Sequence, residues 1–494
     1  MKAATKRITK QINWKAIFRI HGFLMIVTGV AMLLPLAVSI FHHGPDTESF
    51  AISSGVTMLA GVLVMYVNRS HRGIPMGKRE GCLLTATVWL VLSAFGMLPF
   101  MIGKPSLGAS DAFFESMSGF TTTGASLITN YENFSNAMLL WRSMMQWIGG
   151  MGIIIFTVAL LPMLNSSGGL QMFNAESTGF TKDKIAPRVS STAKRLYSLY
   201  ILLTAIAAGL LWLGPMNLFD SICHAMSTLS TGGFSTNAEG LNHWHSPYIN
   251  AVVLVFMFVG SVNFVVIYRI LHGQIKQAWR NETLRAFVAI IIVVTLIFIG
   301  VGLLNHVEAS PLERVLDPLF NVVSTISSTG YEVGRVAGWG GPIVPILLLL
   351  MLIGGCAGST SGGLKIDRIV YLWKNCRIEM QRIVHPNRYY ALTFDGRPTP
   401  PEVMAKVIAF VLIYILLIFI TSIVLSVLGM GTGQAFIASI TCIGNSCSST
   451  EIVNNAYSAI PEAGKWILAL LMMIGRLELF TVLVLFTTTF WRRG

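Results

Sequence analysis

Long apolar windows run from one end of the chain to the other, and they constrain the fold more than any other feature. A helix that crosses a bilayer needs about 20 mostly apolar residues. Ten windows of this kind lie near residues 18–41, 50–67, 81–102, 143–164, 196–214, 248–268, 286–304, 343–373, 404–428 and 464–490. Only 12% of the residues are charged, whereas a typical soluble protein has roughly 25%. The sequence therefore predicts an all-α protein that crosses a membrane many times.

Lysine and arginine are spread unevenly over the connections between these spans, and this orients the chain. With the N-terminus inside and strict alternation, 29 of the 35 basic residues fall on the inner side. The inner connections then carry a net charge of +21 and the outer ones −8. This predicts cytoplasmic N- and C-termini, with Arg142 in an outer connection. It also explains the net charge of +13 without a nucleic-acid partner.

Four further apolar runs are too short to cross a bilayer, and all of them lie in outer connections. They start at Asp111, Asp220, Asp317 and Gly431. Each run reaches a glycine thirteen residues later, at Gly124, Gly233, Gly330 and Gly444. The intervals between these glycines are 109, 97 and 114 residues, which indicates an internal repeat. An aspartate at the front of an apolar run is a helix-start signal, so we expect short helices that begin there.

The repeat divides the chain into an extra N-terminal pair of transmembrane helices and four similar units. Each unit is predicted to contain a helix, a re-entrant short helix, a glycine-centred loop and a second helix. The predicted boundaries are 1–80 for the extra pair and 81–191, 192–282, 283–402 and 403–494 for the repeats. The expected fold class is an all-α polytopic membrane protein with four pseudo-repeats around one central ion pathway.

Non-helical backbone at membrane depth must be buried in protein or line a water-filled cavity. A single such loop would more simply be a tight turn, but four loops satisfy the rule best by meeting on one axis. Carbonyl oxygens there would replace the hydration shell of a cation, and the short helices would point their negative ends below it. Glycine suits such loops because it accepts positive φ and close approach. The candidate filter residues are Thr122, Thr123, Gly124, Thr231, Gly232, Gly233, Thr329, Gly330, Tyr331, Ile443, Gly444 and Asn445.

A glycine-rich segment interrupts the span at 343–373. Residues 354–363 include five glycines and three Ser or Thr residues, and each glycine costs a helix about 1 kcal/mol relative to alanine. We expect a loop below the filter that obstructs the pathway and moves to open it, although a fixed kink is an alternative. Its candidate gating residues are Gly354, Gly355, Cys356, Ala357, Gly358, Ser359, Thr360, Ser361, Gly362, Gly363 and Lys365.

Arg476 lies inside the last apolar span. A charge near the bilayer centre costs about 2.5 to 3.5 kcal/mol on insertion scales, so such a residue faces a cavity or a partner. Our hypothesis is that Arg476 is a barrier to resting cations in the pathway. The alternative is a buried structural salt bridge.

Five motifs resemble those of one superfamily. They are TTTGAS at 121–126, STGGFST at 230–236, SSTGYEVG at 327–334, GGCAGSTSGGLK at 354–365 and MIGRLELF at 473–480. With them the chain resembles the Trk/Ktr/HKT superfamily of potassium transporters over essentially its whole length. The fourth loop departs from the pattern, because Ile443, Gly444 and Asn445 stand where Gly-Pro-Gly is expected.

The resemblance implies a potassium uptake protein of the bacterial inner membrane. It implies a channel-like K⁺ translocation subunit driven by the membrane potential and gated by the glycine-rich loop. It also implies a homodimer and a cytosolic ring of TrkA-type nucleotide-binding regulatory subunits. K⁺ is then the bound and transported ion, and no organic cofactor is expected. The implied K⁺ ligands are the backbone carbonyls of Thr123, Gly124, Gly232, Gly233, Thr329, Gly330, Ile443 and Gly444.

Other classes fit the sequence less well. The segment 358–365 lacks the Gly-Lys-Ser/Thr of a phosphate-binding loop, and there is no metalloprotease or nucleophile-elbow motif. The six cysteines have neither metal-site nor disulfide-framework spacing. We therefore expect no enzyme. The remaining alternative is an ion-coupled secondary transporter, either a K⁺/H⁺ or K⁺/Na⁺ symporter or a small-solute carrier, since such proteins also use broken helices.

Overall fold

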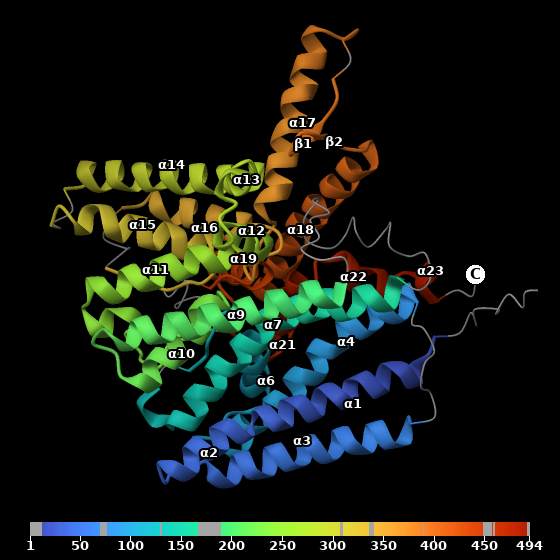
Figure 1. Cartoon of the computed structure of the whole chain (residues 1–494), viewed down its shortest axis with the longest axis vertical. Helices are drawn as coiled ribbons and strands as arrows, with labels where there is room; N and C mark the ends of the chain where they lie inside the picture. The colour runs from blue at the N-terminus through green and yellow to red at the C-terminus, as the bar shows by residue number, and fades with distance from the viewer. Residues whose placement is uncertain are drawn as a thin grey trace, which may run out of the picture.

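The computed structural model describes residues 12–69, 77–128, 131–165, 189–306, 310–334, 340–388, 390–447, 457 and 460–491. The two chain ends predicted to be cytoplasmic, residues 1–11 and 492–494, lie outside the described residues. The fold is almost entirely helical (Figure 1).

Within the described residues, six helices or joined helix pairs are long and apolar enough to cross a membrane. They are α1 with α2 (Trp14–Ala31 and Leu33–Phe41), α3 (Thr47–Val67), α4 with α5 (Lys78–Gly96 and Leu98–Ile102), α9 (Val189–Trp212), α14 (Glu282–Leu304) and α18 (Pro401–Val427). Helix α7 (Asn136–Asn165) fills the span predicted at 143–164. The chain is thus a multi-pass membrane protein.

Two predicted spans are broken in ways that their apolar sequences did not indicate. Helices α11 (Pro247–Ser261) and α12 (Phe264–Leu271) meet at 114°, and α21 (Glu462–Arg476) is followed at 111° by α22 (Phe480–Leu483) and η4 (Val484–Phe486). At the first break, Asn263 caps α12 through Val265 N and donates to the Ala357 carbonyl at 2.8 Å. The second break contains the positive φ of Glu478 and Leu479.

The predicted interruption of the third repeat is present. Helix α16 (Ile343–Ile353) ends at Gly354, and α17 (Ile366–Val384) begins after the glycine-rich loop. Helix α17 and the antiparallel pair β1 (Thr393–Phe394) and β2 (Arg397–Pro398) project from the rest of the molecule (Figure 1). The remaining elements are η1 (Tyr131–Asn133), η2 (Gly240–Trp244), α13 (Ile275–Trp279) and α23 (Thr488–Trp491).

The four short helices are α6 (Ala109–Phe120), α10 (Leu218–Leu229), α15 (Glu313–Ile326) and α19 (Thr432–Gly444). Asp111 and Asp220 lie in the first turns of α6 and α10, as predicted. The prediction of a helix start at Asp317 is wrong, because α15 begins at Glu313 and contains Asp317 in its interior. The cause is a capping box, in which Ser310 and Glu313 accept hydrogen bonds from each other's backbone nitrogens.

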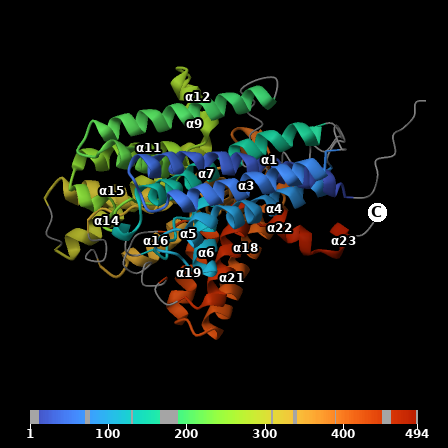
Figure 2. The same ribbon diagram turned by 90° about the horizontal axis from the view of Figure 1, so that it is seen from below.

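The repeats are arranged around a centre. In Figure 1 the cyan and teal first repeat lies across the molecule from the yellow third repeat, and the N-terminal pair α1 and α3 flanks the first. Figure 2 places the green second repeat opposite the orange and red fourth repeat. Two large apolar clusters hold them, one mainly from the first and fourth repeats and the other mainly from the second and third.

A glycine seam fixes the short helices against their neighbours. In α7, α11 and α21 a glycine packs directly on the last or, in α21, the penultimate residue of the short helix of the same repeat. A Cβ on these glycines would lie 3.0 Å or less from a carbonyl oxygen, Gly149 from Phe120, Gly260 from Leu229 and Gly475 from Ile443. These three glycines therefore identify equivalent positions in the first, second and fourth repeats.

Candidate ion pathway

The loops after α6, α10 and α15 have the same backbone conformation. The second residue after each short helix is left-handed, Thr122 at φ 54°, Thr231 at 55° and Ser328 at 59°. The glycine two positions later also has positive φ, Gly124 at 79°, Gly233 at 77° and Gly330 at 89°. Glycine is required at these positions, because side chains rarely adopt this conformation.

The fourth loop shares the first part of this backbone pattern, the left-handed residue after the short helix, in a different sequence register. Asn445 is left-handed at φ 46°, and its nitrogen donates to Cys442 O just as Thr122 N donates to Gly119 O. Asn445 therefore corresponds to Thr122, and Cys447 corresponds to Gly124. The predicted filter glycine Gly444 is instead the last residue of α19.

This correspondence changes which residues of the fourth repeat belong to the loop. Ile443 and Gly444 are helical residues, and Ile443 is the one packed on Gly475. The thirteen-residue spacing from Gly431 therefore ends on the last residue of α19, one position before the left-handed Asn445. The seam and the backbone hydrogen bonds together assign Asn445, Ser446 and Cys447 to this loop.

The four loops form a ring. Loop names follow the repeats, with loop 1 containing Gly124, loop 2 Gly233, loop 3 Gly330 and loop 4 Cys447. The ring is closed between loop 4 and the third repeat through Thr325 in the last turn of α15. The ring contacts are Gly124 against Gly232 O, Gly233 against Thr329 O, Cys447 N to Thr123 O at 3.0 Å and Ser446 Oγ to Thr325 O at 3.4 Å. The structure thus brings together the loop residues of the first three repeats that the sequence predicted.

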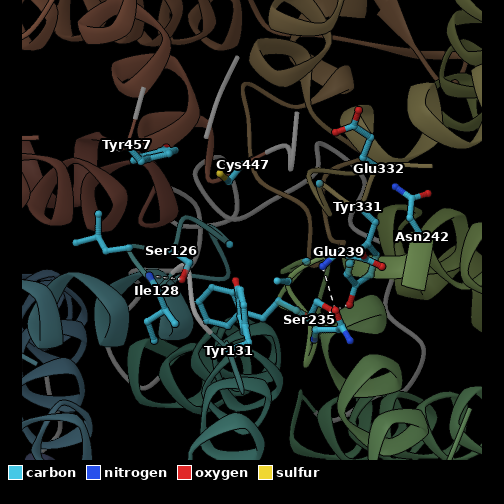
Figure 3. A pocket seen from close by; sticks show the side chains of 18 residues that line it. Ser126, Ile128, Tyr131, Ser235, Glu239, Asn242, Tyr331, Glu332, Cys447 and Tyr457 are labelled. Atoms are coloured by element: carbon cyan, nitrogen blue, oxygen red, sulfur yellow. Dashed lines mark hydrogen bonds between the residues drawn. The ribbon is translucent and has the colours of Figure 1, made fainter. Parts of the chain in front are cut away.

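A cavity of about 340 Å³ lies against this ring (Figure 3). Residues of all four loops line it, including Gly124, Gly233, Gly330 and Cys447. Figure 3 shows Glu239, Glu332 and Asn242 on one side of the cavity and Tyr457 with Cys447 on another. Carboxylates at the mouth of a cavity attract cations.

Two of the carbonyls predicted to bind K⁺ also accept hydrogen bonds from the protein. Thr123 O accepts from Cys447 N, and Gly232 O accepts from Gln146 Nε2 at 2.8 Å. A carbonyl oxygen has two lone pairs, so such a bond leaves one for a cation. Tyr331, another predicted filter residue, lines the cavity and donates its hydroxyl to Phe234 O at 2.9 Å.

Sequence reasoning placed Arg142 in an outer connection, and this is wrong. Helix α7 begins at Asn136 instead of near residue 143, and Arg142 is fully buried behind loops 1 and 2. Its Nε donates to Glu115 Oε1 at 2.8 Å, Nη2 to Ser126 Oγ at 3.0 Å and Nη1 to Ser235 O at 3.3 Å. The ion pair between Glu115 and Arg142 therefore holds two neighbouring loops together.

A buried polar residue one turn before the end of the short helix anchors the loop in three repeats. Glu115 accepts from Ser126 Oγ, His224 Nε2 shares a hydrogen bond with Ser235 Oγ at 3.1 Å, and Asn321 bonds both backbone groups of Val333. The fourth repeat has Ala438 at this position. Its loop instead depends on Asn445, whose amide donates to Thr123 Oγ1 and Met472 O, both at 2.9 Å.

The glycine-rich loop lies directly below the ring. Thr231 Oγ1 donates to Thr360 Oγ1 at 3.3 Å, and the Ser328 and Ser361 hydroxyls are 2.9 Å apart. The Lys365 ammonium donates to Ser361 O. Gly354, Gly358, Gly363 and Lys365 have positive φ, so the segment is an irregular buried loop.

Arg476 reaches the same loop from the fourth repeat. It is 5% exposed, and its Nη1 donates to Thr360 O at 2.6 Å. Among the described residues, its Nε and Nη2 have no hydrogen-bond partner and it forms no ion pair. Two residues on, Glu478 pairs with Arg368 of α17 at 2.7 Å. Within the described residues, the Arg476 guanidinium therefore has no acidic partner with which to form the structural salt bridge of the alternative hypothesis.

Fold and site together define a multi-pass membrane protein with four re-entrant loops around one central pathway. The chain belongs to the TrkH family of cation transport proteins, which matches residues 48–492. This confirms the resemblance and the fold class, and it agrees with the expectation of a transporter rather than an enzyme.

Individual relatives cover nearly the whole chain. The chain is 36% identical to the Trk system potassium uptake protein TrkH of Escherichia coli K12, over 97% of this chain and 100% of the relative. It is 32% identical to the Trk system potassium uptake protein TrkI of Halomonas elongata, over 99% and 100%. The crystal structure of the potassium transporter TrkH from Vibrio parahaemolyticus superposes with a TM-score of 0.88 at 33% identity, covering 97% and 100%.

Proposed function

We propose that the chain is the K⁺ translocation subunit of a potassium uptake system in the bacterial inner membrane. The observation that carries the proposal is the closed ring of four re-entrant loops with a cavity against it. The relatives from Escherichia coli and Halomonas elongata are themselves Trk system potassium uptake proteins. Inward movement is downhill when the inside is negative, by about 2.3 kcal/mol per charge per 100 mV.

The filter is assigned to the loop backbones. The proposed K⁺ ligands are carbonyls of Thr123, Gly124, Gly232, Gly233, Thr329 and Gly330, with Ser446 and Cys447 replacing Ile443 and Gly444. Rubidium uptake into liposomes containing the purified chain tests this, with Gly330→Ser as the variant. Uptake should be present in the parent and lost in the variant. A parent without uptake would contradict the proposed function.

One glycine with positive φ marks each of loops 1 to 3, compared with the longer TVGYG filter of potassium channels, so we propose looser exclusion of sodium. Sodium should compete measurably with rubidium uptake. Complete exclusion of sodium would contradict this part of the proposal.

The glycine-rich loop and Arg476 are proposed as one gate, supported by their contact at Thr360 O. Shortening residues 356–361 and substituting Arg476→Ala should each increase rubidium flux, because each removes an obstruction below the ring. Unchanged flux in both variants, with normal folding, would contradict gating at this level.

The proposed assembly is a homodimer with a cytosolic ring of TrkA-type nucleotide-binding subunits. Helix α17 supports the dimer, because it projects from the protomer and exposes apolar side chains (Figure 1). These side chains are Trp373, Met380, Ile383 and Val384. Substituting them with Ser should yield monomers on size-exclusion chromatography. Uptake that responds to an added TrkA-type subunit and nucleotide would support the ring.

Ion-coupled symport is the second candidate. Broken helices in three repeats favour symport. In all four repeats, however, the short helix follows the first long helix in the same order, so the repeats are parallel, and this disfavours an inverted-repeat carrier. Rubidium uptake that requires a pH or sodium gradient at fixed membrane potential would support symport.

A further inference from the structure

Gln146 of α7 reaches across the boundary between two repeats and holds the backbone of loop 2. It is fully buried, and its Nε2 donates to Gly232 O at 2.8 Å. Its Oε1 accepts from Ser227 Oγ at 2.6 Å and from Phe234 N at 3.2 Å. A backbone nitrogen only donates and a carbonyl only accepts, so these partners fix which way the amide points.

The loop is packed against this side chain. A Cβ at Gly232 would overlap the Gln146 amide group, so glycine is needed there for the contact. One amide therefore bonds to loop 2 on both sides of Gly233, at Gly232 and at Phe234. Any displacement of loop 2 toward or away from the axis would break at least one of these bonds.

The position does not need an amide for packing. The glycine seam makes Gly149, Gly260 and Gly475 equivalent. The residue three positions earlier is Gln146 in the first repeat, but Met257 in the second and Met472 in the fourth, all fully buried. The same level of the fold thus accepts an apolar side chain of similar length.

We propose that Gln146 is a positioning residue that determines the preference for K⁺ over Na⁺. The inference depends on the proposed function, because it requires that the Gly232 carbonyl faces a transported ion. A donor on a carbonyl oxygen restrains it and withdraws charge from its free lone pair. Na⁺, the smaller ion, needs closer and stronger ligands to replace its hydration shell, so a restrained oxygen of lower field strength favours K⁺.

The test compares rubidium and sodium uptake in proteoliposomes for four proteins. They are the parent, Gln146→Met, Ser227→Ala and the control Ser143→Ala. Gln146→Met keeps the volume and removes the hydrogen bonds. Ser227→Ala leaves the amide in place but removes one of its anchors. Ser143 is buried one turn earlier in α7, and its hydroxyl donates to Leu139 O in the same helix.

The expected result is a fall in the rubidium-to-sodium uptake ratio of about five- to tenfold for Gln146→Met, the scale of one to two lost hydrogen bonds. Ser227→Ala should produce a smaller fall, and Ser143→Ala none. The rubidium-to-sodium uptake ratio distinguishes a positioning role from general misfolding, because misfolded protein loses rubidium and sodium uptake together.

Each outcome decides the matter. A selective parent with an unchanged ratio in Gln146→Met overturns the inference, as does an equal loss of both fluxes. If Gln146→Met does not elute as a monodisperse protein, Ser227→Ala decides, and an unchanged ratio there overturns the inference. A parent that takes up no rubidium overturns the proposed function itself, which is a different failure.

Discussion

Loop 1 and loop 4 occupy equivalent places in the ring, yet different residues hold them. Loop 1 has a glycine with positive φ at Gly124 and is anchored from behind by Glu115 and Arg142. Loop 4 has Cys447 and Ala438 at the corresponding positions and depends on the Asn445 amide. The left-handed residue, Thr122 in loop 1 and Asn445 in loop 4, is shared, whereas the residue two positions later and the contacts that stabilise the loop differ. In the fourth repeat, whose sequence resembles the other three least, sequence similarity is therefore a poor guide to which residues form the filter.

The strongest test of this comparison is a pair of alanine substitutions. Gly233→Ala should reduce rubidium uptake by about a hundredfold or more, because the new Cβ would overlap Thr329 O in a strained conformation. Gly444→Ala should reduce uptake much less, since this glycine is helical and its Cβ would make one tight contact, 3.0 Å from Met351 O, instead of an overlap. An equal loss of rubidium uptake in both variants would instead support the sequence-based prediction that Gly444 is the filter glycine of the fourth repeat.

A second test removes the charge that anchors loop 1. Arg142→Met should destabilise the protein by about 3 to 5 kcal/mol, because Glu115 would remain as a buried, uncompensated charge. The measurement is thermal unfolding in detergent. Lys374→Met is the control, because its pair with Glu282 is 30% and 21% exposed and should cost about 1 kcal/mol or less. Similar losses in the two variants would mean that the buried pair has no special role.

The smallest expected effect concerns loop 4. Asn445→Gly retains the left-handed conformation but removes the bonds to Thr123 Oγ1 and Met472 O. We expect the rubidium-to-sodium uptake ratio to fall about three- to fivefold, with little change in thermal stability. An unchanged ratio would show that the backbone of loop 4 needs no side-chain support.

The sequence predicted the parts of the fold that depend on local composition. Apolar windows located the spans, and the repeated short runs located α6, α10 and α19. The helix breaks near Asn263 and Glu478 were missed, because contacts with residues distant in sequence stabilise them. The Ser310 and Glu313 capping box was a local signal that could have corrected the start of α15.

The candidate site was predictable where glycine is compulsory and unpredictable elsewhere. Positive φ at Gly124, Gly233 and Gly330 leaves a mark in the sequence. Ser446 and Cys447 of loop 4 have no such mark, and the predicted filter therefore ended at Asn445. Arg142 and Gln146 were missed because their roles appear only when α7 is placed beside loop 2.

Joining four unequal quarters in one polypeptide has an evolutionary consequence. In a pore built from four identical subunits, every mutation appears four times, so most changes at the axis are lethal. In this chain a single mutation changes one of the four loops and leaves the other three intact. A single substitution can consequently adjust ion preference by a small step.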